Sequence, residues 1–185
     1  MKAKKLLLVS ALLSVAMAAG AQSARELIEQ DTSRIACQLH HYEVPDFHDS
    51  KAPAGYNPFY VSHFGRHGSR YHTSDRAFAG TVKELRAMDG QGLLTDTGKG
   101  FLRDMEAFDA AHQGMGGYLT QRGSKEDQGV ATRLYERCPK MFKQKDRKEV
   151  LAVSSTVVRC NQSMMNFCTA LKGKAPSLDI AYYAN

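Results

Sequence analysis

Residues 149–173 read EVLAVSSTVVRCNQSMMNFCTALKG, and this stretch sets the fold class of the chain. Its first part, residues 149–154, is a short aliphatic run that predicts a buried strand. Apolar side chains then recur at positions i, i+3, i+4 and i+7 from Met164 to Leu171, which predicts a helix that ends near Gly173. The stretch therefore predicts a strand followed directly by a helix.

A second buried strand is predicted upstream, over residues 59–64. The run FYVSHF is rich in aromatic residues and is bounded by Pro58 and Gly65. Further helices are predicted over residues 24–29, 75–88, 97–111 and from Ser124 to Pro139, and residues 177–185 read as the beginning of another strand. Strand, helices, strand and helix in this order predict an α/β protein with a parallel sheet that helices cover on both faces.

The loop after residues 59–64 holds the candidate chemistry, in the sequence Arg66-His67-Gly68-Ser69-Arg70. Ligands of open α/β sheets bind beyond the carboxyl ends of the strands, where this loop lies. Guanidinium groups present planar donor forks to phosphate oxygens, and their charge favours a neutral, nucleophilic imidazole. Gly68 is expected to let the backbone approach a ligand. Taken alone, so short a motif also fits a basic turn with a histidine in solvent.

Arg159 follows the other predicted strand and stands at the N-terminus of the helix after it. Backbone N–H groups and the helix dipole favour an anion at that place. Because neighbouring parallel strands deliver their following loops to one crevice, we expect Arg66, Arg70 and Arg159 to converge on His67 and to bind one phosphate.

These motifs together resemble the histidine acid phosphatases, the second branch of the histidine phosphatase superfamily. The resemblance covers about residues 55–173 and rests on the Arg-His-Gly-x-Arg loop, on Leu119-Thr120 and Gly123 ahead of a helix ending in Cys138-Pro139, and on Ser154-Ser155 with Arg159 and Ser163. Residues 64–71, FGRHGSRY, look most like the multiple inositol polyphosphate phosphatases, which act on phytate and lower inositol phosphates. The implied fold is the parallel-sheet sandwich of the histidine phosphatases.

The resemblance implies that His67 is the nucleophile of a phosphomonoester hydrolase and that Arg66, Arg70 and Arg159 bind the phosphate. Hydrolysis through a phosphohistidine is nucleophilic covalent catalysis, for which no metal or other cofactor is expected. Small-molecule inositol polyphosphates such as phytate are the expected substrates. His63 and His72 are further candidates for site histidines.

The chain departs from the family in two places. Tyr71-His72 stand where many members have proline, which favours the inositol polyphosphate phosphatases over plant and fungal phytases. No histidine follows His112, whereas the family takes a second histidine and a neighbouring acidic proton donor from a later strand. We therefore expect residues 22–185 to be the N-terminal part of the domain, without the later strands and most of the helical insertion.

The N-terminus predicts export to the periplasm or the exterior. A basic start at residues 1–5, an apolar run at 6–19 and the small residues 19–21 are typical of a signal peptide over residues 1–21. The run is short of the roughly 20 apolar residues of a spanning helix, so we expect no stable membrane span once the signal is removed. Cleavage would lower the formal net charge from +6 to +3, which does not favour nucleic-acid binding.

Four cysteines lie in the part expected to be exported, namely Cys37, Cys138, Cys160 and Cys168. Disulfides persist in oxidising compartments, and buried free thiols are equally compatible with the sequence. No C-x-x-C pair occurs, which does not favour zinc.

Three other functions compete with the phosphatase hypothesis. A catalytically incomplete fragment that binds phosphate or inositol phosphate would retain the arginines and lack the proton donor. A cytosolic phosphate mutase of the first branch would use the same histidine, but that branch usually has no arginine at the position of Arg70. A nucleic-acid binder would show an affinity that falls steeply with salt.

Overall fold

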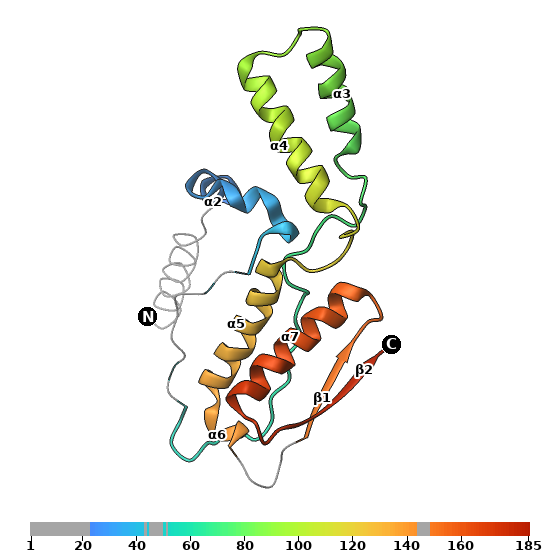
Figure 1. Ribbon diagram of the computed structural model, residues 1–185. Helices are drawn as coiled ribbons and strands as arrows, with labels where there is room; N and C mark the ends of the chain where they lie inside the picture. Colours follow the sequence, from blue (N-terminus) through green and yellow to red (C-terminus); the bar gives the residue numbers. More distant parts are fainter. Residues whose placement is uncertain (1–22, 43, 45–49, 51, 144–148) are drawn as a thin grey trace, which may run out of the picture. The chain divides into compact units, whose positions relative to one another are not determined.

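The computed structural model covers the chain in residues 23–42, 44, 50, 52–143 and 149–185 (Figure 1). The chain divides into two compact units, Met1–His40 and His41–Asn185. The signal peptide predicted over residues 1–21 lies outside the described residues. Within the described ranges, no helix combines the length and the apolar character needed to cross a membrane.

The first unit contains the helix α2, Ala24–Gln30, and the 3₁₀ helix η1, Thr32–Leu39. Ser23 begins α2 with a capping box, because its hydroxyl accepts the Glu26 N–H while the Glu26 carboxylate accepts the Ser23 N–H. The short helix predicted over residues 24–29 is confirmed.

The second unit contains a parallel sheet of two strands, β1 (Glu149–Ser154) and β2 (Asp179–Ala184). Glu149 is paired with Asp179 at one end and Ser154 with Ala184 at the other. The helix α7, Val158–Lys174, connects the strands. The strand predicted at 149–154, the helix after it and the strand near the C-terminus are therefore confirmed, and the chain is of mixed α/β class.

The core of this unit lies between α7, β2 and two further helices, α5 (Gln121–Arg137) and α6 (Pro139–Phe142). The helices α5 and α7 lie side by side (Figure 1). Burial of apolar side chains between them supplies the main driving force for their packing. The buried cluster consists of Ala131, Phe142, Cys168, Leu171, Ala175, Leu178 and Ile180.

The described residues cover only one face of β1. Val150 and Ala152 are half-buried and pack against the core, whereas Leu151 is 68% exposed and Val153 is 59% exposed. Successive residues of a strand point to opposite faces, so the exposed pair marks the second face of the sheet. The expectation of helices on both faces is wrong for this strand.

The predicted strand at residues 59–64 is also wrong, since these residues form neither helix nor strand. Val61 packs against the core, and the ring of His63 stacks on Phe167 of α7 with ring centroids 4.8 Å apart. Tyr60 and Phe64 are exposed. The segment lies along the core without joining the sheet. A run rich in aromatic residues forms a strand only where the backbone of a neighbouring strand is available to pair with it.

Two predicted helices begin at other residues than expected. The helix α3, Ala79–Gly90, starts later than the predicted 75–88, after turns at residues 75–78. The helix α5 starts earlier than predicted, because Thr120 rather than Ser124 is its N-cap. The helix α4, Asp96–His112, confirms the prediction for 97–111 and packs against α3.

Three of the cysteines are free thiols in the structure: Cys138, Cys160 and Cys168. Cys168 belongs to the buried core, and its burial raises the pKa of its thiol. The side chain of Cys37 is not among those that the structure describes. The alternative of free thiols therefore holds for these three.

Candidate active site

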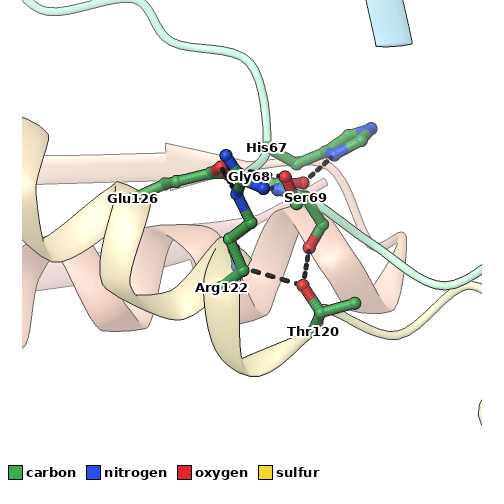
Figure 2. A network of polar contacts seen from close by, with 7 residues as sticks. His67, Gly68, Ser69, Thr120, Arg122 and Glu126 are labelled. Carbon is green, nitrogen blue, oxygen red and sulfur yellow. Dashed lines mark hydrogen bonds and ion pairs between the residues drawn. The ribbon is translucent and has the colours of Figure 1, made fainter. Parts of the chain in front are cut away.

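The loop 66–70 is held by the first two turns of α5 (Figure 2). The backbone N–H and the hydroxyl of Thr120 both donate to the Ser69 carbonyl, at 2.9 and 3.0 Å. From the next turn, the Glu126 carboxylate accepts the Ser69 N–H at 2.7 Å and the Ser69 hydroxyl at 2.9 Å. Arg122 forms an ion pair with Glu126 at 3.1 Å. Ser69 thus has both its backbone groups and its side chain bound to one helix terminus.

Two glycines allow this close contact between loop and helix. A methyl group on Gly68 would collide with the carbonyl of Gly123, and one on Gly123 would collide with the carbonyl of Ser69. Only glycine permits backbones to approach so closely. The sequence predicts that Gly68 lets the backbone approach a ligand. In the structure, the backbone at Gly68 closely approaches the backbone of α5 at Gly123.

His67 is half-buried, and its ring has a defined tautomer. Its Nδ1 lies 2.8 Å from the Gly68 carbonyl oxygen. A carbonyl only accepts hydrogen bonds, so Nδ1 carries the proton and Nε2 keeps its lone pair. In Figure 2 the ring points away from Glu126. In the neutral ring, Nε2 is therefore the nitrogen with a free lone pair.

Burial and positive charge both keep this ring neutral. Burial is the main cause that lowers the pKa of His67, while the hydrogen bond to the Gly68 carbonyl opposes it. Three positive charges lower this pKa further, those of Arg159, Arg70 and Arg66. All four side chains named from the sequence thus share one electrostatic environment.

Two of the three arginines have a buried donor that no acceptor satisfies. The Nε atoms of Arg70 and Arg159 are buried and have no hydrogen-bond partner among the described residues. The Nη1 atom of Arg70 donates to the Tyr71 carbonyl at 2.8 Å. A buried N–H without an acceptor costs free energy, which an anion placed between these groups would recover.

Arg66 differs from the other two arginines, because it is exposed. Its guanidinium carbon lies 5.3 Å from the centre of the Tyr42 ring, a cation–π distance, and the Tyr42 hydroxyl donates to its backbone carbonyl. Burial raises the pKa of Tyr42, so the hydroxyl stays protonated and remains a donor at neutral pH.

Further polar contacts link the loop to α7 and to the turn before α5. The Gly68 N–H donates to the hydroxyl of Ser163 at 3.1 Å, and the Leu119 N–H donates to Gln162 at 2.9 Å. Arg70 and Leu119 form an isolated antiparallel bridge. These contacts join the loop 66–70, the start of α5 and the first half of α7.

Sequence reasoning had quoted Thr120, Gly123 and Ser163 as parts of the family motif without giving them a role. In the structure Thr120 binds Ser69, Ser163 binds Gly68, and Gly123 lies against both residues of the loop. The sequence does not predict Glu126 or Asp127 as members of the site, because Asp127 resembles the acidic residue of a capping box begun by Ser124 and nothing marks Glu126.

The two other candidate histidines have other partners. The ring of His63 stacks on Phe167, and burial lowers its pKa. The Nδ1 of His72 accepts the Ser74 N–H at 3.2 Å, and the His72 N–H donates to the Nε2 of buried His112 at 2.8 Å. Neither ring is among the groups that shift the pKa of His67.

No group of three or more His, Cys, Asp or Glu side chains in the described part of the chain is arranged to hold a metal ion. No model of a known protein family matches the chain, and no curated protein matches it.

Proposed function

We propose that this chain carries the nucleophile and the phosphate-binding arginines of a phosphomonoester hydrolase that works through a phosphohistidine. The observation that carries the proposal is the ring of His67: its Nδ1 is bound to the Gly68 carbonyl, and burial and three guanidinium groups lower its pKa, which favours a neutral ring with Nε2 unprotonated. The two buried and unpartnered Nε donors, on Arg70 and Arg159, support an anion as the ligand. Phosphate fits both features, because it is an electrophile at phosphorus and an anion at its oxygens.

The reaction has two steps. In the first, Nε2 of His67 attacks phosphorus, the N–P bond forms, and the bond to the leaving alcohol breaks. In the second, water attacks phosphorus and the N–P bond breaks, which releases inorganic phosphate and restores the ring. Arg66, Arg70 and Arg159 stabilise the charge on the phosphoryl oxygens in both steps. The leaving alcohol takes its proton from a donor that we assign to no residue of this chain.

The proposed substrates are inositol polyphosphates such as phytate, and this part of the proposal rests on the family resemblance. The proposed fold is correspondingly the N-terminal part of a histidine phosphatase domain, and the proposed location is outside the cytoplasm after removal of residues 1–21. A substrate with several phosphate groups suits a site in which three arginines are combined with one nucleophile.

Hydrolysis of p-nitrophenyl phosphate and binding of inorganic phosphate test the proposal together. We expect turnover by the 185-residue chain and its loss in His67→Ala, with phosphate binding retained. Arg159→Ala should weaken phosphate binding by about tenfold or more, because it removes a charge-assisted hydrogen bond. Matched controls are His72→Gln for the histidine and Arg103→Ala, an exposed arginine of α4, for the arginine.

Two results would count against the proposal in different ways. Phosphate binding that depends on Arg159 but comes without turnover would favour the incomplete phosphate-binding fragment. Absence of both turnover and binding in the folded chain would overturn the phosphate site itself.

The pH profile supplies a second test. The pKa of His67 is lowered, so the ring stays neutral below its ordinary value of 6.5. Activity limited by protonation of this ring should therefore persist at pH values below 6.5 and fall only at more acidic pH. A profile that already falls at pH 7 would contradict the assignment of His67 as the nucleophile.

A further inference from the structure

Both backbone groups of Gly68, the carbonyl and the N–H, form hydrogen bonds with side chains. Its carbonyl accepts the proton of Nδ1 of His67 at 2.8 Å, and its N–H donates to Ser163 at 3.1 Å. The carbonyl decides which nitrogen of His67 is free. Whatever fixes Gly68 therefore also fixes the tautomer and the orientation of the ring.

The groups that hold the Gly68 N–H are buried between α5 and α7. Ser163 of α7 is 9% exposed, and Asp127 of α5 is 5% exposed. The Ser163 hydroxyl and the Gly68 amide both lie near the Asp127 carboxyl, where hydrogen bonding to them lowers its pKa. Its Oδ2 atom is buried and has no hydrogen-bond partner in the described part of the chain.

The state of the Asp127 carboxyl is consistent with this position. Burial raises its pKa to about 6, and the charge of neighbouring Glu126 adds to the rise, although the two hydrogen bonds lower it. A carboxyl group without solvent or a cation around it retains a proton more readily than one at the surface. Its neighbours across the interface, Ser163 and Gly68, are uncharged.

A serine hydroxyl rotates freely unless a second partner fixes it. Ser163 Oγ accepts from Gly68 only when its own proton points elsewhere, and the carboxyl group of Asp127 supplies the acceptor for that proton. Asp127 of α5 thus orients the Ser163 hydroxyl of α7, and that hydroxyl holds the loop. Residues that support a reactive histidine commonly act in this indirect way.

We propose that Asp127 and Ser163 are positioning residues for His67: Asp127 orients the Ser163 hydroxyl, and Ser163 holds the Gly68 amide, so that the Gly68 carbonyl stays on Nδ1 and leaves Nε2 free. The inference rests on the proposed role of His67 as nucleophile, since only a nucleophile requires that Nε2 stay free. Glu126 acts beside them by holding Ser69.

Nuclear magnetic resonance of the 185-residue chain labelled with ¹⁵N-histidine tests the proposal, because the ring shifts report the tautomer directly. At pH 7.5 the wild-type ring of His67 should be almost entirely in the Nδ1–H form. Ser163→Ala should raise the ratio of Nε2–H to Nδ1–H by about fivefold, the factor that one lost hydrogen bond corresponds to. Amide hydrogen exchange at Gly68 should accelerate by a similar factor.

Conservative variants separate positioning from a general loss of structure. Asp127→Ala should shift the tautomer as Ser163→Ala does, while Asp127→Asn, which keeps a carbonyl acceptor, should retain the wild-type ratio. The double variant Ser163→Ala/Asp127→Ala should shift the tautomer ratio by less than the two single variants combined, because Asp127 acts mainly through the hydrogen bond that Ser163 makes to Gly68. Thr169→Ala on the exposed side of α7 and Asp104→Asn on α4 are matched controls and should change neither signal.

The two proposals fail separately. Unchanged His67 and Gly68 signals in folded Ser163→Ala would overturn the positioning role, whatever the activity of the wild type. Absence of hydrolysis and of phosphate binding in the wild type would overturn the proposed function, even if the tautomer shifts as expected.

Discussion

The loop 66–70 and the segment 59–64 just before it lie next to each other in the sequence and differ in how they are held. In the loop, Gly68 and Ser69 bind side chains of α5 and α7 through both backbone and side-chain groups. In the segment, Phe59, Tyr60 and Phe64 are 76%, 74% and 101% exposed. The geometry of the candidate site is therefore set by helices that follow much later in the chain. The residues that lead into the loop have fewer such contacts: Val61 packs against the core and His63 stacks on Phe167, and the other large side chains are exposed.

The largest effect should come from closing the space between the loop and α5. Gly123→Ala places a methyl group against the Ser69 carbonyl, and the backbones on both sides have to move. We expect a loss of more than about 3 kcal/mol in the free energy of unfolding, above the usual cost of an overpacked core, measured by urea denaturation. Gly80→Ala in α3, where nothing lies within 4 Å, should instead stabilise by about 0.5–1 kcal/mol. If both substitutions changed the free energy of unfolding equally, the close contact between the loop and α5 would not be a special constraint.

The next effect concerns the pH dependence of stability. The pKa of Asp127 is about 6 in the folded chain, against 3.8 for a free side chain. Between pH 3.8 and 6 the folded chain therefore binds a proton at Asp127 that the unfolded chain has mostly lost. Stability present below pH 3.8 is then lost as the pH rises through 6, by up to about 3 kcal/mol for this group. Asp127→Asn should remove this part of the slope in denaturation curves recorded from pH 4 to 7. A slope that is unchanged in the variant would show that Asp127 titrates normally.

A smaller loss should follow when the carboxylate under Ser69 is removed. Glu126→Ala leaves the Ser69 N–H and hydroxyl without their acceptor, and we expect a destabilisation of about 2 kcal/mol with weaker phosphate binding. Glu136→Ala, an exposed position on the same helix, should change the stability by less than about 0.5 kcal/mol. The comparison fails if thermal denaturation gives the same midpoint for both variants.

The smallest effect is expected in the segment before the loop. Phe64→Ser replaces a side chain that is fully exposed, so the free energy of unfolding should change by less than about 0.5 kcal/mol and phosphate binding should stay as it is. A loss of more than about 2 kcal/mol would mean that residues 59–64 support the loop after all.

The sequence alone was sufficient for the parts of the fold that rest on local patterns. The strand Glu149–Ser154 and the helix Val158–Lys174 follow from an aliphatic run and from apolar residues at helical spacing. The mixed α/β class follows from the same alternation. Residues 59–64 have the composition of a strand as well, but pairing depends on what lies beside them, which no local pattern contains.

The grouping of Arg66, His67 and Arg70 was predictable for the same reason, since they stand in one short motif, and in the structure the charges of the two arginines lower the pKa of His67. Glu126 and Asp127 were not readable. On sequence grounds Asp127 resembles the acidic residue of a capping box begun by Ser124, and nothing marks Glu126; in the structure both lie against Gly68 and Ser69. Predicting them requires the tertiary contact between residues far apart in the chain.

The contact between Gly68 and Gly123 also bears on how the site comes into being during folding. The hydrogen bonds that fix the loop join residues 57 and 95 positions apart, so the loop cannot take its shape before both helices have docked. A synthetic peptide of residues 66–70 would accordingly contain the two arginines and the histidine of the loop, but its backbone would have no preferred conformation. Phosphate binding by this protein would then be a measure of global folding rather than of a local sequence.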